Sequence, residues 1–397
     1  MFLGVGLALL SPSGAENAGL LGDVFVGALK AIAPILIFIM VIVAIATKPP
    51  DTKTNIKSIV AMYAAGTFLA AITAVMASVL FPTELVLATN YDSAASAPLR
   101  VADVLKTVLF NIIDNPIKAL ANANFLGVLA WGIGIGIAFH HSSSERTKTV
   151  LKDLSGAVLI LVRAIIRMAP FGIFGIMAKT FAETGFGALA SYGHLLLVLV
   201  GAMLFTMSVI NPIIMFAKSH RNPYPLIWLC IKESAVTAFF TRSSAANTPI
   251  NLTLCKKMQL NEDTYSISIP LGSVLNMSGA AVTVTTFSLA AAHTLGIEAS
   301  FGSMIFLCFI SALAACGTSG VAGGSILLIP LACSLFSIPN DAAMQVVAIG
   351  FIVGVVQDSF ETALNSSTDV MFTAAASKKT PVLDFENSAN RSLDSQV

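Results

Sequence analysis

Five polar side chains near the carboxyl end of the chain have the spacing of one helical face. They are Asp358, Glu361, Thr362, Asn365 and Asp369, at offsets of 0, 3, 4, 7 and 11 residues in a largely apolar stretch. These offsets place all five on one side of an α-helix. Carboxylate and amide oxygens accept hydrogen bonds from an ammonium group and coordinate hard cations. The pattern therefore predicts a site for positively charged ligands.

The composition is that of a membrane protein. Of 397 residues, 56% are hydrophobic and 11% are charged, whereas a soluble domain has roughly 45–50% apolar and about 25% charged residues. The 22 basic residues balance 21 acidic ones, which argues against a nucleic-acid partner because such proteins concentrate basic charge. The five cysteines are odd in number and lack C-x-x-C spacing, so neither a disulfide framework nor a zinc site is expected. We expect a lipid bilayer to surround most of the chain.

Long apolar runs follow one another along the sequence. Charge-free runs near or above the roughly 20 residues that span a bilayer occur at 58–81, 119–139, 184–217, 264–297 and 299–340. Shorter or interrupted runs add 31–47, 154–178 and 342–357. Residues 1–10 are apolar but lack the basic start of a signal peptide, and we interpret them as part of a helix whose natural start lies upstream of Met1. The sequence predicts an all-α membrane protein.

Two segments cannot be simple crossings. Lys and Arg mark the cytoplasmic side, yet only one apolar stretch separates the basic pairs at 218–221 and 256–257. That stretch must enter the membrane and return to the same side. The run 299–340 has 42 residues, about 63 Å as one helix, and the glycine-rich segment 316–325 divides it into arms too short to span. It is predicted to be a second re-entrant hairpin, entering from outside.

The hairpin tips predict a binding site between them. Non-helical backbone at membrane depth is tolerated only where protein buries it or water reaches it. Each hairpin is followed by a helix with a polar middle, which is typical of inverted repeats in secondary transporters. The first tip, 241–249, is small and hydroxylated, and its half-helix ends can present N–H groups to a carboxylate. Proline and glycines in 270–279 favour unwinding, which frees carbonyl oxygens for a cation, and Asn276 can add a side-chain oxygen.

Charge balance indicates what binds there. Each acid at bilayer depth costs roughly 2.5–3.5 kcal/mol, and the nearby cation in the sequence is Arg242, at the first tip. One arginine against three carboxylates leaves about two negative charges to be neutralised. A substrate ammonium group and a sodium ion would neutralise them. Arg242 could equally be a plain counter-ion that never contacts the substrate.

Four motifs resemble those of one transporter family. The runs TRSSAAN (241–247), NMSGA (276–280) and GTSGVAGG (317–324) and the pair Asn365-x-x-x-Asp369 resemble the glutamate-transporter family of dicarboxylate/amino acid:cation symporters, and within it the bacterial members that carry serine and threonine with sodium. The resemblance implies eight transmembrane helices, the first one truncated here, plus two re-entrant hairpins. It also implies a homotrimer in the bacterial inner membrane, a cytoplasmic C-terminus, sodium as the coupling ion, no cofactor and no catalytic residues.

The same resemblance divides the chain into a static scaffold and a mobile transport domain. Scaffold helices 1–2 fall on residues 1–54 and scaffold helices 4–5 on residues 101–188. The transport domain takes helix 3 at 55–84 and a core at 189–377, with hairpin 1 at about 224–256 and hairpin 2 at about 301–338. Residues 378–397 are expected to form a cytoplasmic tail.

The family's binding residues carry over position by position. The resemblance implies that Asp358 accepts the substrate amino group and that Asn365 contacts the substrate carboxylate. Hairpin contacts to the substrate fall on Ser243, Ser244, Val321 and Gly323. Sodium ligands fall on Gly272, Asn276, Asn365 and Asp369, and carbonyls near Thr318 suggest a second sodium position.

One departure from the family pattern bears on substrate specificity. Dicarboxylate members place an arginine where Glu361 stands, and an acid there would repel a side-chain carboxylate. Aspartate and glutamate are therefore disfavoured as substrates. We assign either Glu361 or Thr362 to a substrate hydroxyl, or Glu361 to a salt bridge with Arg242, and the sequence does not choose between them.

Two further departures bear on sodium coupling. Ser278 and Ala280 stand where the family motif has an acid and a threonine, which removes one sodium-ligating carboxylate and one side-chain contact. The hydroxyl pair that helps the same ion is reduced to Gly66 and Thr67. Fewer coupled sodium ions are expected.

These observations predict a symporter that imports serine and threonine with sodium by alternating access. The alternative is a sodium- or proton-coupled transporter of another neutral amino acid or of a dicarboxylate. A channel with the same cavity is a further alternative, which substrate-limited flux would exclude. A remote alternative is an intramembrane serine protease, because 317–320 reads G-T-S-G, but such proteases place a histidine after the serine and none follows His293.

Overall fold

Helices make up the regular structure of the part of the chain that the structure describes. The computed structural model describes residues 2–47, 55–87, 110, 113–142, 144–184, 187–316 and 323–377. Within these ranges six helices are long and apolar enough to cross a membrane, and a pair bent by 45° makes seven if it counts as one span. The prediction of an all-α membrane protein is confirmed.

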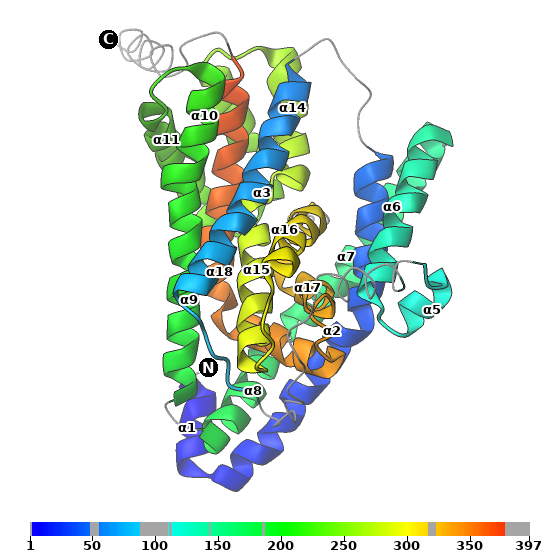
Figure 1. The fold of residues 1–397 in the computed structure, drawn as a ribbon, viewed down its shortest axis with the longest axis vertical. Coiled ribbons are helices and arrows are strands. Elements are labelled where there is room, and N and C mark those ends of the chain that lie inside the picture. Colours follow the sequence, from blue (N-terminus) through cyan, green and yellow to red (C-terminus); the bar gives the residue numbers. More distant parts are fainter. Residues whose placement is uncertain are drawn as a thin grey trace.

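One group of helices forms around α2. Its elements are α1 (Phe2–Leu10), α2 (Pro12–Ala46), α5 (Pro116–Ala121), α6 (Phe125–Ser142), α7 (Glu145–Arg167) and α8 (Ala169–Thr184). Ser11 begins α2 because its Oγ accepts the N–H of Gly14 at 3.1 Å, and Pro12 suits the first helical position. Figure 1 shows α1 and α8 at the lower end of α2 and α6 beside its upper part.

A second group forms around α18. Its elements are α3 (Ile56–Leu80), α9 (Gly187–Phe205), η1 (Thr206–Ile210), α10 (Asn211–Ser219), α11 (Tyr224–Cys230), η2 (Ile231–Ala235), α12 (Val236–Thr241), α13 (Ser244–Lys257), α14 (Glu262–Leu275), α15 (Ser278–Thr294), α16 (Phe301–Ala315), η3 (Ser325–Leu328), α17 (Ile329–Ser334) and α18 (Asn340–Ala375). Helix α18 packs against α12, α13, α14, α15 and α17. The polar stripe therefore lies on the central helix of this group.

Two helical hairpins enter the second group from opposite ends. In the first, α11, η2 and α12 lead to a turn at Arg242, which has a left-handed φ of 50°, and α13 returns. In the second, α16 leads in, and η3 and α17 return. The first hairpin opens beside the start of α14 and the end of α18, whereas the second opens beside the start of α18 (Figure 1). This arrangement agrees with the predicted re-entrant hairpins.

A short break interrupts the apolar run between the hairpins. Helix α14 ends at Leu275 and α15 begins at Ser278. Asn276 has φ −92° and ψ 79°, and Met277 has φ −116° and ψ 49°. Backbone groups at a helix end lack helical partners, so the predicted unwinding is present. The side chain of Asn276 and the N–H of Gly279 at this break bond to the middle of α18.

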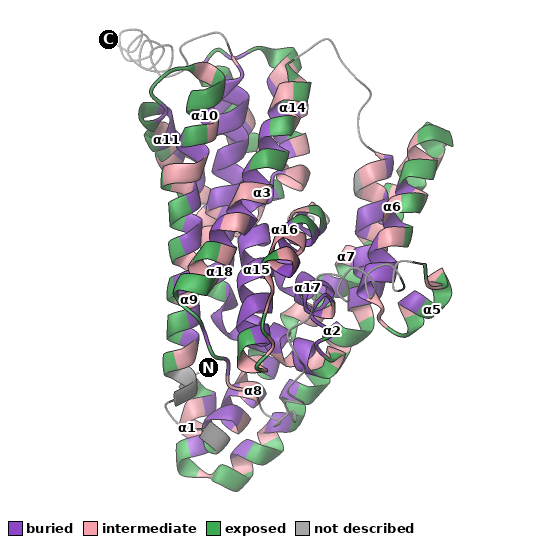
Figure 2. Ribbon diagram, in the orientation of Figure 1, coloured by how far each residue is buried: buried purple, intermediate pink, exposed green. Residues whose placement is uncertain are grey.

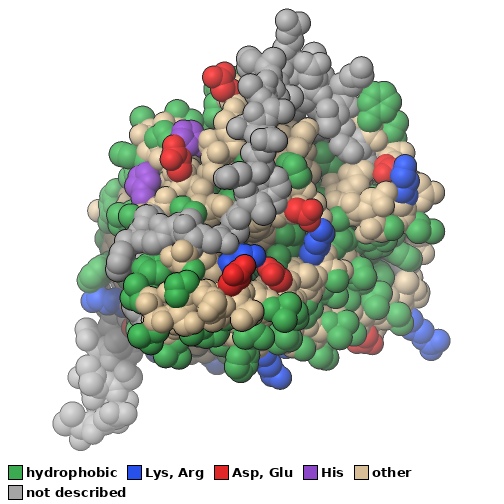
Figure 3. All heavy atoms as spheres, turned by 90° about the horizontal axis from the view of Figure 1, so that it is seen from below, with side chains coloured by type: hydrophobic (Ala, Val, Ile, Leu, Met, Phe, Trp, Pro, Cys, Tyr) green, Lys and Arg blue, Asp and Glu red, His purple; other side chains and the backbone are tan. Residues whose placement is uncertain are grey.

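The helices that carry the polar residues of the candidate site are buried inside the protein. Figure 2 shows α15 and α18 buried along most of their length. The surface seen from the end that carries α1 mixes hydrophobic side chains with scattered charged ones (Figure 3). Because α18 is buried, its polar stripe faces neighbouring protein elements rather than lipid.

Candidate functional site

The five polar residues of α18 lie together and are buried. Their exposed fractions are 4% for Asp358, 6% for Glu361, 5% for Thr362, 3% for Asn365 and 1% for Asp369. Helices α14 and α15 and both hairpins pack around them. Among the described residues, the ion pairs of the protein involve none of these three acids. Hydrogen bonds and ligands must therefore compensate the carboxylates.

Asp358 is incompletely satisfied. Its Oδ1 accepts the N–H of Gly323 at 3.3 Å, where the second hairpin turns back with a φ of 75°. Its Oδ2 is buried and has no hydrogen-bond partner in the described ranges. Arg242 interacts with this carboxylate electrostatically, without an ion pair between the two described side chains. A buried anionic oxygen without a partner is costly, so Asp358 offers an acceptor to a cationic group.

Glu361 is held by donors from three elements. Its Oε2 accepts hydrogen bonds from Thr283 Oγ1 on α15 at 2.7 Å, from Ser325 Oγ at the start of η3 at 2.7 Å, and from Gln357 Nε2 on α18 at 2.5 Å. Gln357 Nε2 also donates to Thr283 Oγ1 at 2.8 Å. In the described structure these hydrogen bonds stand in place of the salt bridge with Arg242 that the sequence left open.

Oxygen atoms gather around Asp369 where α14 gives way to α15. The Nδ2 of Asn276 donates to Asp369 Oδ1 at 2.9 Å and to the carbonyl of Asn365 at 3.2 Å. The Oδ1 of Asn276 is buried without a partner among the described residues. Gly272 permits the close approach of the acid, because an added Cβ would lie 2.4 Å from Asp369 Oδ1. Carboxylate, amide and carbonyl oxygens are the ligands that a hard cation prefers.

Asn365 connects this cluster to the start of α15. Its Oδ1 accepts the N–H of Gly279 at 2.7 Å, and its Nδ2 donates to Met277 Sδ at 3.5 Å. The first N–H groups of a helix have no helical acceptor, so Asn365 satisfies one of them. Gly279 allows this contact, because an added Cβ would lie 2.8 Å from the Cα of Glu361.

Opposed hairpins, an unwound helix and buried acids between them are the architecture of a secondary transporter. The model of the sodium:dicarboxylate symporter family matches residues 1–379. The chain belongs to this family. Its members are sodium-coupled symporters of dicarboxylates or amino acids, and they use Na⁺ as the coupling ion without a cofactor. Members are transporters rather than enzymes, which excludes the intramembrane protease.

In this member of the family, the first hairpin is fixed to α18 by residues that the sequence analysis missed. Asn247 Nδ2 donates to Ser366 Oγ at 2.9 Å, and Asn251 Nδ2 donates to the Ser366 carbonyl at 2.8 Å. Ser234, on the other arm, donates to Asn251 Oδ1 at 2.6 Å. The spacing of the two asparagines, four residues apart in a hydroxyl-rich segment, was the available signal.

The structure describes three of the residues that are predicted to form the hairpin contacts. The Oγ of Ser243 accepts the N–H of Ala246 at 3.3 Å and caps α13, and Ser244 is 4% exposed in the first turn. Gly323 donates its N–H to Asp358. Val321 and Thr318 lie outside the described residues.

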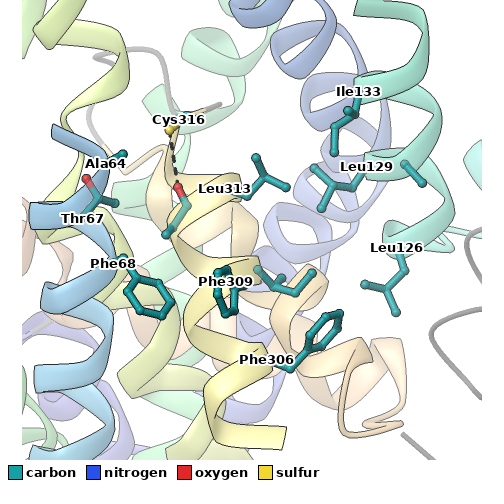
Figure 4. A pocket seen from close by; sticks show the side chains of 13 residues that line it. Ala64, Thr67, Phe68, Leu126, Leu129, Ile133, Phe306, Phe309, Leu313 and Cys316 are labelled. Atoms are coloured by element: carbon teal, nitrogen blue, oxygen red, sulfur yellow. Dashed lines mark hydrogen bonds between the residues drawn. The ribbon is translucent and has the colours of Figure 1, made fainter. Parts of the chain in front are cut away.

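A separate apolar cavity of about 670 Å³ lies beside the polar site. Figure 4 shows Phe68 on α3, Leu129 on α6, Phe309 and Leu313 on α16, and Cys316 directly after α16 around it. The acids of α18 do not line it. Its apolar walls offer no hydrogen-bond partners to a charged substrate, whereas the buried acids lie on α18.

Proposed function

We propose that the chain imports serine and threonine together with sodium across the bacterial inner membrane. The observation that carries the proposal is the buried Oδ2 of Asp358 between the two hairpins, which has no hydrogen-bond partner among the described residues. An α-ammonium group supplies both the positive charge and the N–H donors that this oxygen lacks. The hairpin tips and Asn365 receive the carboxylate of the same amino acid.

Glu361 and Thr362 set the side-chain preference in this proposal. The carboxylate of Glu361 stands where transport of a dicarboxylate needs a cation, and its neutral donors leave the negative charge in place. Thr362 is 5% exposed on the same face, and its hydroxyl is not engaged by any described residue. We therefore assign Thr362 to the substrate hydroxyl. A different neutral amino acid or a dicarboxylate remains the alternative substrate.

We assign the coupling ion to the oxygens around Asp369. The ligand set is the carboxylate of Asp369, the backbone carbonyls of Gly272 and Asn365, and the Oδ1 of Asn276, which has no partner in the described part of the chain. Carbonyls near Thr318 supply a second sodium position in this proposal. Ser278 offers a hydroxyl where the family motif has an acid, which supports a smaller number of sodium ions.

Transport in this proposal moves the group around α18 against the group around α2. The scaffold comprises residues 1–54 and 101–188, and the transport domain comprises 55–84 and 189–377. The second hairpin closes over the substrate once sodium has ordered its backbone, so ion and substrate favour the same closed state. The active form is a homotrimer with a cytoplasmic C-terminal tail.

Uptake of radiolabelled serine into proteoliposomes tests class, ion and substrate together. We expect saturable uptake under an inward sodium gradient, and none when the gradient is collapsed or replaced by a proton gradient. Excess threonine blocks uptake, and excess aspartate hardly affects it. Uptake driven equally well by protons would refute the assigned ion, strong competition by aspartate would refute the role of Glu361, and flux that does not saturate would indicate a channel.

A further inference from the structure

One oxygen atom of Glu361 joins three elements of the fold. Thr283, Ser325 and Gln357 all donate to Oε2, and a carboxylate oxygen offers two lone pairs. This oxygen therefore has no capacity left for the hydroxyl of a substrate. A buried carboxylate whose oxygen is fully used by protein donors acts as an anchor for the elements that supply those donors.

Only Ser325, among the three donors, belongs to a hairpin. It is the first residue of η3, directly after the hairpin tip. Two residues earlier, Gly323 donates its N–H to the neighbouring acid of α18. One residue later, Ile326 lies against Gly350, where an added Cβ would come within 2.7 Å of Ile326 Cγ2. The start of the return arm is thus attached to two acids and packed directly on the backbone of α18.

We propose that the hydrogen bond from Ser325 to Glu361 is the latch of the second hairpin. The return arm leaves α18 only if this bond breaks, so the latch sets how readily the closed site opens. Thr283 and Gln357 hold the carboxylate toward Ser325. This inference rests on the proposed function, in which the second hairpin covers the substrate, and it makes Ser325 and Glu361 positioning residues that act through the hairpin.

The charge of Glu361 strengthens the latch. Hydrogen bonds to an ionised acceptor are roughly twice as strong as those between neutral groups. Glu361→Gln retains one acceptor oxygen but removes the charge, and Ser325→Ala removes the donor. Both variants weaken the same bond, so their effects should not add.

A native cysteine can report the opening of the hairpin. Cys316 borders the tip and lines the apolar cavity (Figure 4), and it is partly exposed. The other cysteines, Cys230, Cys255, Cys308 and Cys333, are at most 1% exposed. The thiol of Cys316 donates to the Leu275 carbonyl at 3.5 Å, so movement of the tip away from the end of α14 frees it. The change that ligands cause in the rate at which a membrane-permeant maleimide labels Cys316 in the reconstituted protein therefore reports the movement of the second hairpin.

The experiment compares latch variants with a matched serine of the same arm. In wild type, sodium and serine together should slow labelling of Cys316 about tenfold. Ser325→Ala should abolish most of this protection and raise the KM for serine about tenfold, a loss of about 1.4 kcal/mol, with little change in maximal rate. Ser325→Thr keeps the hydroxyl and should restore both. Ser334→Ala is the control, because among the described residues that hydroxyl donates only to the Leu331 carbonyl, at 2.6 Å.

Several outcomes would overturn the latch. These are wild-type labelling and KM in Ser325→Ala, additive effects in the double variant with Glu361→Gln, and a wild type in which ligands never protect Cys316. If wild type transports neither serine nor threonine, the proposed function fails. Protection by sodium alone, compared between wild type and Ser325→Ala, then still decides whether the latch exists.

Discussion

Asp358→Asn is the sharpest test of the site, because it should weaken the binding of substrate but stabilise the substrate-free protein. With substrate bound, the variant loses a charge pair between buried groups. Removal of one partner from a buried pair costs about 3–5 kcal/mol, which corresponds to a roughly 150-fold or greater loss of affinity. Without substrate, the variant loses a buried anionic oxygen that has no partner among the described residues. The substrate-free protein should therefore become more stable.

Two measurements on the same purified protein separate these effects. Titration with serine in saturating sodium gives the affinity, and thermal unfolding without amino acid gives the stability. Asp263→Asn is the matched control, because this acid is exposed at the start of α14. Affinity for serine within threefold of wild type in Asp358→Asn would refute the assignment of the ammonium group. A lower unfolding temperature would show that the carboxylate has a stabilising partner in the protein.

Three further predictions concern the ion and the movement. Asp369→Asn should raise the sodium concentration for half-maximal uptake at least about tenfold while serine still binds at high sodium, and an unchanged sodium dependence would exclude Asp369 as a ligand. Gly272→Ala should also raise the sodium concentration for half-maximal uptake, because its Cβ would lie 2.4 Å from Asp369 Oδ1 and 2.8 Å from the Tyr63 hydroxyl. Gly134→Ala is the control, because an added Cβ at this position on α6 meets no atom within 4 Å. Lys30 on α2 forms an ion pair with Asp341 on α18. A short thiol cross-link between Lys30→Cys and Asp341→Cys should therefore arrest uptake, and reduction of the link should restore it. Continued uptake by the linked protein would contradict the proposed domain movement.

Much of the fold could be predicted from the sequence because a bilayer restricts the backbone structures that a chain can adopt. Each backbone group at membrane depth needs an internal partner, so run length and the side on which Lys and Arg lie decide which segments cross and which return. The run 299–340 could not be one helix, and the structure resolves it into α16 and the arm that begins at Ser325. The stripe on α18 could be predicted for a related reason, since acids at such depth are costly and rare and usually mark ligand or ion sites.

The partners of the acids could not be read in the same way. Thr283, Ser325 and Gln357 are ordinary polar residues, and three different elements bring them to one oxygen of Glu361. Only Gln357, one helical turn before Glu361, carried a local signal. The sequence analysis counted Glu361 among the charges that need a cation, whereas hydrogen bonds from neutral groups satisfy its Oε2. Tertiary contacts of this kind depend on the packing of the elements, which spacing alone does not specify.

The hydrogen bonds of Glu361 also constrain how sodium and substrate communicate. Because protein donors occupy Glu361 Oε2, Asp358 and Asp369 are the acids that we assign to ligands. They lie 11 residues apart on one helix, about 16 Å along its axis. An ammonium group on Asp358 and a sodium ion beside Asp369 therefore do not touch. Asn365 lies between them. Its carbonyl and the Asp369 carboxylate both accept hydrogen bonds from the Nδ2 of Asn276, and its side-chain Oδ1 accepts the N–H of Gly279. A sodium ion that orders the break between α14 and α15 also fixes the side chain of Asn365, which receives the substrate carboxylate in the proposed mechanism. Coupling between ion and substrate is therefore indirect and passes through Asn365.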